Sequence, residues 1–214
     1  APVALLRLVP QCDRLRAEVQ SDLNGPVQVE LRARDPSRDI IGLPVRTLVN
    51  AGRGSTVVAQ LQPQGRGGPL DLVLEAVPGQ PGARHTPFAY RLPFAGEKVQ
   101  VSQAGAGRFS HEDAENRDAV DFPLPEGTPV LASRGGLVMQ AVDQFDGNGL
   151  DPIRDRGRAN FIRLLHDDGS MAVYAHLQHR GVLVRQGQRI EQGQRIALSG
   201  NTGYSTAPHL HFVV

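Results

Sequence analysis

The first part of the chain alternates between apolar and polar positions, which is the pattern of half-buried β-strands. Every second residue is apolar from Val27 to Ala33, and the same period of two returns from Leu70 to Ala76. Turn-forming stretches rich in Pro, Gly and charged residues lie between them, at residues 35–38 and 63–69. Residues 14–19 allow a helical turn as well as a strand. Several short strands at this spacing predict a small β-sandwich of immunoglobulin type over residues 1–95.

The pattern changes beyond residues 93–107, a glycine-containing stretch that we interpret as the junction between two domains. Short apolar segments follow, and Asp167-Asp168-Gly169 between two of them predicts a hairpin turn. The sequence Gln-Gly-Gln-Arg-Ile occurs twice, at 186–190 and 192–196, and two copies indicate paired turns rather than a solenoid. Residues 96–214 are therefore expected to form a second, antiparallel β-domain, which makes the whole chain all-β.

Composition agrees with this fold class and narrows the possible functions. The 24 glycines and 16 prolines of the 214 residues are typical of a turn-rich β protein. A net charge of +1 with both signs mixed along the chain indicates no nucleic-acid partner. A single cysteine, Cys12, excludes an internal disulfide and a cysteine-based zinc site. No segment approaches the roughly 20 apolar residues of a membrane span.

Two histidines near the end of the sequence carry the strongest chemical signal. His209 and His211 are separated by one residue in an apolar stretch, and residues two apart on a strand point to the same face. Imidazoles that converge near a carboxylate are typical zinc ligands. The pair therefore predicts a hydrolytic metal enzyme.

Several ordered motifs around this pair resemble those of the lysostaphin-type (LytM-like) zinc endopeptidases. The resemblance extends over residues 99–214 and rests on these segments: Ala119-Val120-Asp121-Phe122, Gly127-Thr128-Pro129-Val130, Asp168-Gly169, Tyr174-Ala175-His176-Leu177, the Gly-Gln repeat, Ser199-Gly200-Asn201-Thr202-Gly203 and His209-Leu210-His211-Phe212. The resemblance implies one zinc ion and cleavage of the peptide cross-links of bacterial peptidoglycan. Its stem peptides and cross-bridges would then be the substrate. The protein would be exported to the periplasm or secreted, and a start at Ala1 without methionine suits a removed signal peptide.

The resemblance also implies roles for individual residues. His211 and Asp121 correspond to zinc ligands, and His209 and His176 correspond to the two catalytic histidines. A catalytic zinc takes three protein ligands and leaves one position for water. Two uncoordinated imidazoles beside it can accept a proton, donate one, or stabilise an oxyanion.

The third ligand departs from the compact family pattern, in which a histidine precedes the aspartate by four residues. Arg117 occupies that position here, and a guanidinium stays protonated and cannot bind zinc. The nearest upstream histidine is His111, which we assign as the third ligand. The alternatives are Asn116, Asp113 and Asp118.

Further residues are expected near the substrate or away from the chemistry. The candidate substrate-binding residues are Asn160, Tyr204, Ser205 and Thr206. The remaining histidines are expected to be ordinary surface or loop residues, namely His85, His166 and His179. The Asp- and Gly-rich segment 143–157 lacks the glutamate at the twelfth position of a calcium loop, and is expected to form a mobile wall of the groove.

Two other functions compete with the enzyme. One is a catalytically inactive LytM-like regulator that activates another cell-wall hydrolase, for which His111 is the discriminating residue. The other is a wall-binding module or a carrier domain. A carrier needs a lysine at a hairpin tip, and Lys98 is the only lysine of the chain.

Overall fold

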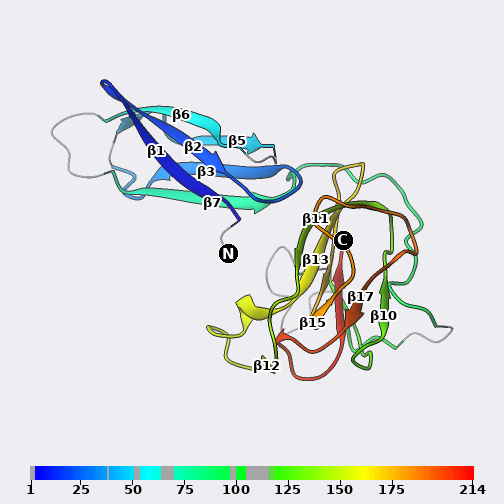
Figure 1. Ribbon diagram of the computed structural model, residues 1–214. Coiled ribbons are helices and arrows are strands. Elements are labelled where there is room, and N and C mark those ends of the chain that lie inside the picture. Colours follow the sequence, from blue (N-terminus) through cyan, green and yellow to red (C-terminus); the bar gives the residue numbers. More distant parts are fainter. Residues whose placement is uncertain are drawn as a thin grey trace. The chain divides into compact units, whose positions relative to one another are not determined.

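The computed structural model describes residues 3–37, 39–50, 54–63, 70–96, 100–104, 116 and 118–214. The chain divides into two compact units, Ala1–Ala83 and Arg84–Val214, and each is described by itself (Figure 1). Both are built from strands, which confirms the predicted all-β class. Among the described residues no helix is long and apolar enough to cross a membrane.

The first unit consists of two antiparallel sheets, with strand orders β1-β2-β6-β4 and β5-β3-β7. Their bounds are β1 Leu5–Gln11, β2 Arg14–Gln20, β3 Val27–Ala33, β4 Ile40–Ile41, β5 Val45–Val49, β6 Thr56–Pro63 and β7 Leu72–Pro78. The predicted alternation is seen most clearly in β3, where Val27, Val29 and Leu31 are buried and the residues between them are partly exposed. Leu31 packs with Ala17 and Leu61 of the other sheet, so the two sheets share one core.

Residues 14–19, for which a helical turn was an alternative, form a strand. They belong to β2, which pairs along its whole length with β1 after a tight turn at Cys12 with φ 42°. Pairing with β1 therefore makes residues 14–19 extended, and the local sequence does not reveal this pairing. The immunoglobulin-type assignment of this two-sheet unit stays a prediction.

The second unit is organised around a seven-stranded sheet of order β16-β11-β13-β14-β19-β9-β8. A three-stranded sheet, β10-β17-β15, and a short parallel pair, β12-β18, complete it. The bounds are β8 Gln103–Ala104, β9 Val120–Phe122, β10 Pro129–Leu131, β11 Gly136–Val142, β12 Asn148–Gly149, η1 (a 3-10 helix) Arg156–Arg158, β13 Phe161–Leu165, β14 Met171–Ala175, β15 Leu177–Val182, β16 Arg189–Ile190, β17 Arg195–Ser199, β18 Gly203–Tyr204 and β19 Leu210–Val213. Its core takes residues from both larger sheets, among them Val130, Ile162 and Ile196.

The division between the units falls at Ala83–Arg84, whereas the sequence placed it after residue 95. The intervening segment is bound to the second unit by the backbone hydrogen bonds Arg91 N to Ser133 O (2.9 Å) and Leu131 N to Pro93 O (2.8 Å). The Phe94 side chain is buried in the second core. A segment without apolar periodicity can thus belong to a domain through backbone hydrogen bonds and one aromatic anchor.

The two Gln-Gly-Gln-Arg-Ile segments form two equivalent turns. Gly187 and Gly193 adopt φ of 83° and 81°, a left-handed conformation that favours glycine. In each turn the glutamine after the glycine accepts a hydrogen bond from a backbone N–H three residues earlier, Gln188 from Arg185 at 3.0 Å and Gln194 from Glu191 at 3.1 Å. The repeat therefore encodes a turn, as predicted.

Candidate metal and catalytic site

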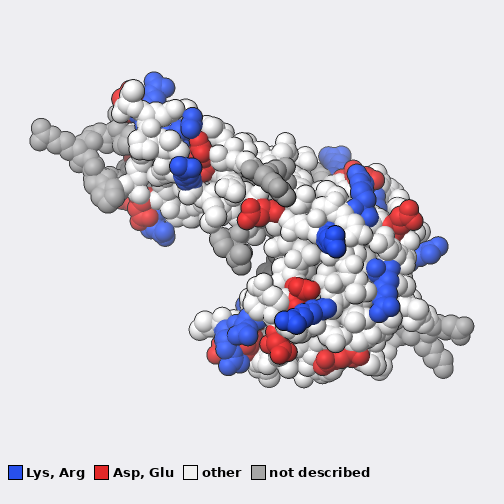
Figure 2. All heavy atoms as spheres, viewed as in Figure 1, with Lys and Arg blue, Asp and Glu red and all other residues white. Residues whose placement is uncertain are grey.

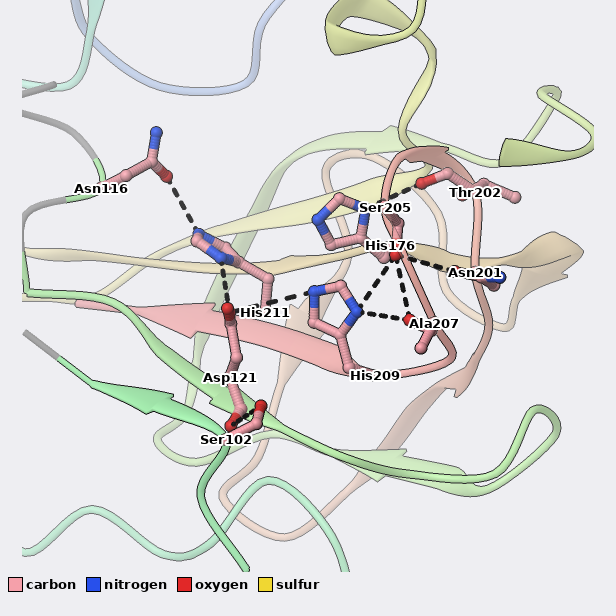
Figure 3. Close-up of polar contacts among 10 residues, drawn as sticks. All are labelled: Ser102, Asn116, Asp121, His176, Asn201, Thr202, Ser205, Ala207, His209 and His211. Carbon is pink, nitrogen blue, oxygen red and sulfur yellow. Dashed lines mark hydrogen bonds and ion pairs between the residues drawn. The ribbon is translucent and has the colours of Figure 1, made fainter. Parts of the chain in front are cut away.

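The candidate site is assembled by three neighbouring strands of the seven-stranded sheet. β19 lies between β14 and β9, with Ala175 opposite His211 on one side and Asp121 opposite His211 on the other. His176 follows directly after β14, and His209 precedes β19. The sheet register thus brings together residues that are up to 90 positions apart in sequence (Figure 3).

Asp121 and His211 form the buried pair of the site. The Nδ1 of His211 lies 2.9 Å from Oδ1 of Asp121, and both residues are under 10% exposed. The other ring nitrogen of His211, Nε2, lies 2.9 Å from Oδ1 of Asn116. A buried carboxylate is therefore directly adjacent to an imidazole, which is a donor set that zinc prefers.

His176 is held in one orientation and one tautomer. Its Nδ1 donates a hydrogen bond to the carbonyl oxygen of Thr202 at 2.7 Å, so the proton sits on Nδ1 and the lone pair on Nε2. Its backbone has φ 60°, an uncommon conformation for a residue other than glycine. Burial, together with the neighbouring His209, lowers the pKa of His176 to about 3. The ring is therefore neutral at physiological pH, with its lone pair on Nε2.

His209 is held in the same tautomer by a different loop. Its Nδ1 lies 2.8 Å from the carbonyl oxygen of Ala207, to which it donates, and 3.2 Å from Oγ of Ser205. Ser205 is itself buried and donates to Oδ1 of Asn201 at 2.7 Å or to Ala207. The Nε2 of His209 remains on the side of Asp121, 4.0 Å from Oδ1.

The two rings lie close together beside the Asp121–His211 pair. The ring centroids of His176 and His209 are 4.5 Å apart, and those of His176 and His211 are 5.9 Å apart. Figure 3 shows all three rings gathered at one end of β19. The arrangement therefore combines two proton acceptors with a possible pair of metal ligands.

The titration of His176 predicts an acid-sensitive fold in the metal-free protein. Its pKa is about 3 in the folded chain and 6.5 in the unfolded chain, so the folded state favours the neutral ring. The contribution of His176 to the free energy of unfolding is therefore complete above pH 6.5 and is lost as the pH falls from 6.5 towards 3. Because the ring keeps some solvent contact, we expect the free energy of unfolding to fall by about 1–2 kcal/mol between pH 7 and pH 5.

Denaturant unfolding with a chelator present measures this effect. The chain has no tryptophan, and its three tyrosines, Tyr90, Tyr174 and Tyr204, all lie in the second unit, so tyrosine fluorescence follows that unit alone. A lowered pKa of the buried His166 adds acid sensitivity of the same sign. The His176→Asn variant isolates the part due to His176, and an equal pH dependence in both proteins would refute the assignment.

Three of the four predicted substrate-binding residues, Tyr204, Ser205 and Thr206, are consecutive, and Ser205 contacts His209. The fourth, Asn160, is buried in the interior. The Asn160 amide bonds both backbone groups of Phe145, accepting from N at 2.9 Å and donating to O at 2.8 Å. Its binding of substrate stays a prediction, and the structure adds a role in holding residue 145 in place.

Thr202 is a site residue that the sequence did not single out. Its carbonyl orients His176, while its Oγ1 accepts from the backbone N of Asn160 at 3.0 Å and donates to the carbonyl of Leu177 at 2.8 Å. It lies in the segment Ser199-Gly200-Asn201-Thr202-Gly203, one of the motifs that carry the family resemblance. Its place in that motif is the signal that could have found it.

One of the three histidines expected to be ordinary surface or loop residues is buried. His166 is 2% exposed and its Nδ1 donates to the carbonyl of Gly135 at 2.8 Å. The surface expectation was wrong for it because the strand end is covered by Tyr90, whose ring centroid lies 5.8 Å from that of His166. His85 is exposed, and His179 is partly exposed with Nδ1 on the carbonyl of Phe145.

The third predicted zinc ligand is not visible in the described part of the chain. His111 and its alternative Asp113 lie outside the described residues, and Asp118 is exposed. Within the described residues no group of three or more His, Cys, Asp or Glu is arranged to hold a metal. The buried Asp121–His211 pair nevertheless fits two ligands of a zinc ion by its chemistry and its proximity.

Comparisons with known proteins agree on the second unit. Residues 115–214 match the model of peptidase family M23. The chain is 30% identical over 135 residues to an uncharacterized metalloprotease of Buchnera aphidicola, covering 62% of this chain and 32% of that protein. It is 38% identical over 96 residues to the peptidoglycan DD-endopeptidase ShyA of Vibrio cholerae, covering 44% of this chain and 19% of ShyA.

A solved structure gives a similar match. The catalytic domain of the antimicrobial peptidase lysostaphin from Staphylococcus simulans aligns at 34% identity, with a TM-score of 0.41, over 53% of this chain and 77% of that one. The chain spans about a third or less of the curated relatives named above.

Proposed function

Because residues 115–214 match the model of peptidase family M23, we propose that this protein is a zinc-dependent endopeptidase that hydrolyses peptide cross-links of bacterial peptidoglycan. The observation that carries the proposal is the pair of imidazoles, His176 and His209, each held by a backbone carbonyl through Nδ1 and lying beside the Asp121–His211 pair. The similarity to ShyA, a peptidoglycan DD-endopeptidase, supports this substrate class. Such a substrate places the protein in the periplasm or outside the cell.

In this proposal Asp121, His211 and His111 hold a single zinc ion. A bound zinc of this kind lowers the pKa of water to about 7 and polarises the scissile carbonyl. In this proposal His176 and His209 are not ligands, and each is oriented by the hydrogen bond of its Nδ1 to a backbone carbonyl. Their Nε2 atoms stay available for proton transfer.

The proton steps then belong to these two histidines. One accepts a proton from the attacking water at Nε2 and later donates it to the leaving amine. The other, once protonated at Nε2, donates a hydrogen bond to the tetrahedral oxyanion and stabilises its negative charge. The carbonyl of Thr202 and the Ala207–Ser205 loop keep each ring in the orientation that this requires. We further propose that Tyr204, Ser205 and Thr206 line the path of the substrate peptide.

Metal removal tests the proposal. We expect the purified chain to cleave the peptide cross-links of purified peptidoglycan. Chelation of the metal should lower the cleavage rate at least about 100-fold, and added zinc should restore it. The new amino termini and the loss of dimeric muropeptides are the readouts. A chain that cuts nothing but stimulates another cell-wall hydrolase would instead support the regulator.

A further inference from the structure

The loop after β11 contains two exposed arginines and is hydrogen-bonded to the loop of the candidate site. Arg156 and Arg158, which we call the arginine rim, lie on η1 and are both exposed. Among the described residues neither forms an ion pair, although the charge of Arg158 helps to lower the pKa of Asp155. By contrast, Arg154 forms an ion pair with Asp155, from Nε to Oδ1 at 2.7 Å.

The loop that carries the arginine rim is built into the site. β12 pairs in parallel with β18, and Nδ2 of Asn148 donates to the carbonyl of Ser205 at 2.9 Å. The backbone N of Ser205 donates to the carbonyl of Gly149 at 3.3 Å. Ser205 also contacts His209, so the rim loop and the catalytic loop are joined through one residue.

Each guanidinium of the rim lies over an aromatic ring. The Cζ of Arg156 lies 5.7 Å from the ring centroid of Tyr204, and that of Arg158 lies 5.9 Å from the ring centroid of Phe145. A stacked guanidinium keeps its N–H donors at the edge free for a planar anion and loses less freedom on binding. The rim is therefore prepared for a carboxylate.

Two of the four acidic residues of the same loop, Asp151 and Asp155, are used internally. Asp155 is 5% exposed and accepts from Arg154 and from the backbone N of Asp151. Asp151 caps the turn through Oδ1, which accepts from the backbone N of Ile153 and of Arg154. Figure 2 shows basic and acidic side chains together over the end of the second unit where Figure 1 draws β12. These internal bonds leave the rim as the cationic part of the loop.

We propose that the arginine rim binds a free carboxylate of the substrate close to the scissile bond. The inference rests on the proposed function and narrows its substrate class to cross-links with a carboxylate-bearing residue, as opposed to an uncharged glycine bridge. Arg156 and Arg158 are then specificity-determining residues that contribute to binding and take no part in proton transfer.

A pair of substrates that differ only in carboxylate charge tests this inference. The substrates are soluble cross-linked muropeptides released by a muramidase, either native or amidated at their carboxylates with carbodiimide and ammonia. For the unmodified protein we expect KM to be about three- to tenfold lower for the native muropeptides than for the amidated ones, with similar kcat. The difference should shrink with added salt.

The double variant Arg156→Gln/Arg158→Gln is expected to lose this preference, with KM for native muropeptides rising to the amidated value. The matched control is Arg185→Gln, an exposed arginine in the turn between β15 and β16, which should retain the preference. Thermal melts confirm that each variant is folded. Equal KM for both substrates in the unmodified protein, or a preference retained in the double variant, would overturn the inference alone. Failure to cleave either substrate would overturn the proposed function and this inference with it.

Discussion

Replacing His209 with alanine is expected to lower kcat for peptidoglycan cleavage by about 10²–10⁴ while the zinc ion stays bound. His209 uses Nδ1 for the carbonyl of Ala207, and its Nε2 lies 4.0 Å from the Asp121 carboxylate, close to the metal ligands without being needed as one. The variant removes a proton-transferring group and leaves Asp121 and His211 in place. Cleavage rates and zinc content, measured on the same sample, check this result.

The matched control for this variant is His85→Ala, because His85 is exposed and belongs to no part of the candidate site. It should keep both the zinc and the rate. If His209→Ala lost the zinc together with the activity, His209 would be a ligand and the division of roles between the two histidines of the His-x-His pair would be wrong.

Replacing Asp168 with alanine is expected to lower the free energy of unfolding of the second unit by about 3 kcal/mol. Oδ2 of Asp168 lies 2.8 Å from Nη1 of Arg134, and both side chains are about nine-tenths buried. The same oxygen accepts from the backbone N of Thr86 at 2.8 Å, and Oδ1 accepts from Oγ of Ser170 at 2.7 Å. The variant would leave a buried guanidinium without its carboxylate.

The pKa of Asp168 shows that the folded state strongly favours the charged carboxylate over the protonated acid. Burial raises this pKa, but the hydrogen bonds from Thr86, Ser170 and Arg134 outweigh burial and hold it far below its usual range. The stabilisation is therefore present at all pH values above the unfolded pKa of about 3.9 and is lost only in stronger acid. Unfolding in denaturant at pH 7, followed by tyrosine fluorescence, measures the full effect.

The neighbouring Asp167 provides the control. Its carboxylate also pairs with an arginine, with Nη1 of Arg189 at 2.6 Å from Oδ1, but both side chains are at least 70% exposed. Because exposed ion pairs contribute little, Asp167→Ala should cost under about 1 kcal/mol. Equal losses for the two variants would show that burial of the Arg134–Asp168 pair has no energetic consequence.

The parts of the structure that were predictable from the sequence are those with a local periodic signal. Alternation identified β3, and the two-residue spacing of His209 and His211 anticipated side chains that approach one site. The two turns at the Gln-Gly-Gln segments, with their left-handed glycines, were also predictable from the sequence. In each case the pattern lies within a few neighbouring residues, where backbone geometry alone determines the outcome.

The parts that were not predictable depend on partners distant in sequence. β2 is a strand because β1 and β6 pair with it, and His166 is buried because Tyr90 covers it. Segment 84–96 belongs to the second unit through hydrogen bonds to residues about 40 positions later. Thr202, 26 residues later in the chain, orients His176 through its backbone carbonyl. The pattern of side chains in the sequence does not show where a backbone carbonyl points.

The zinc content of the purified chain, measured together with cleavage of cross-linked peptidoglycan, tests the central claim most directly. The comparison includes the intact chain, His111→Ala and His209→Ala. We predict a single zinc ion and cleavage for the intact chain, loss of both in His111→Ala, and zinc without cleavage in His209→Ala. An intact chain that binds no zinc and cuts nothing would contradict the endopeptidase, and Arg117 at the usual ligand position would then mark the site of an inactive regulator.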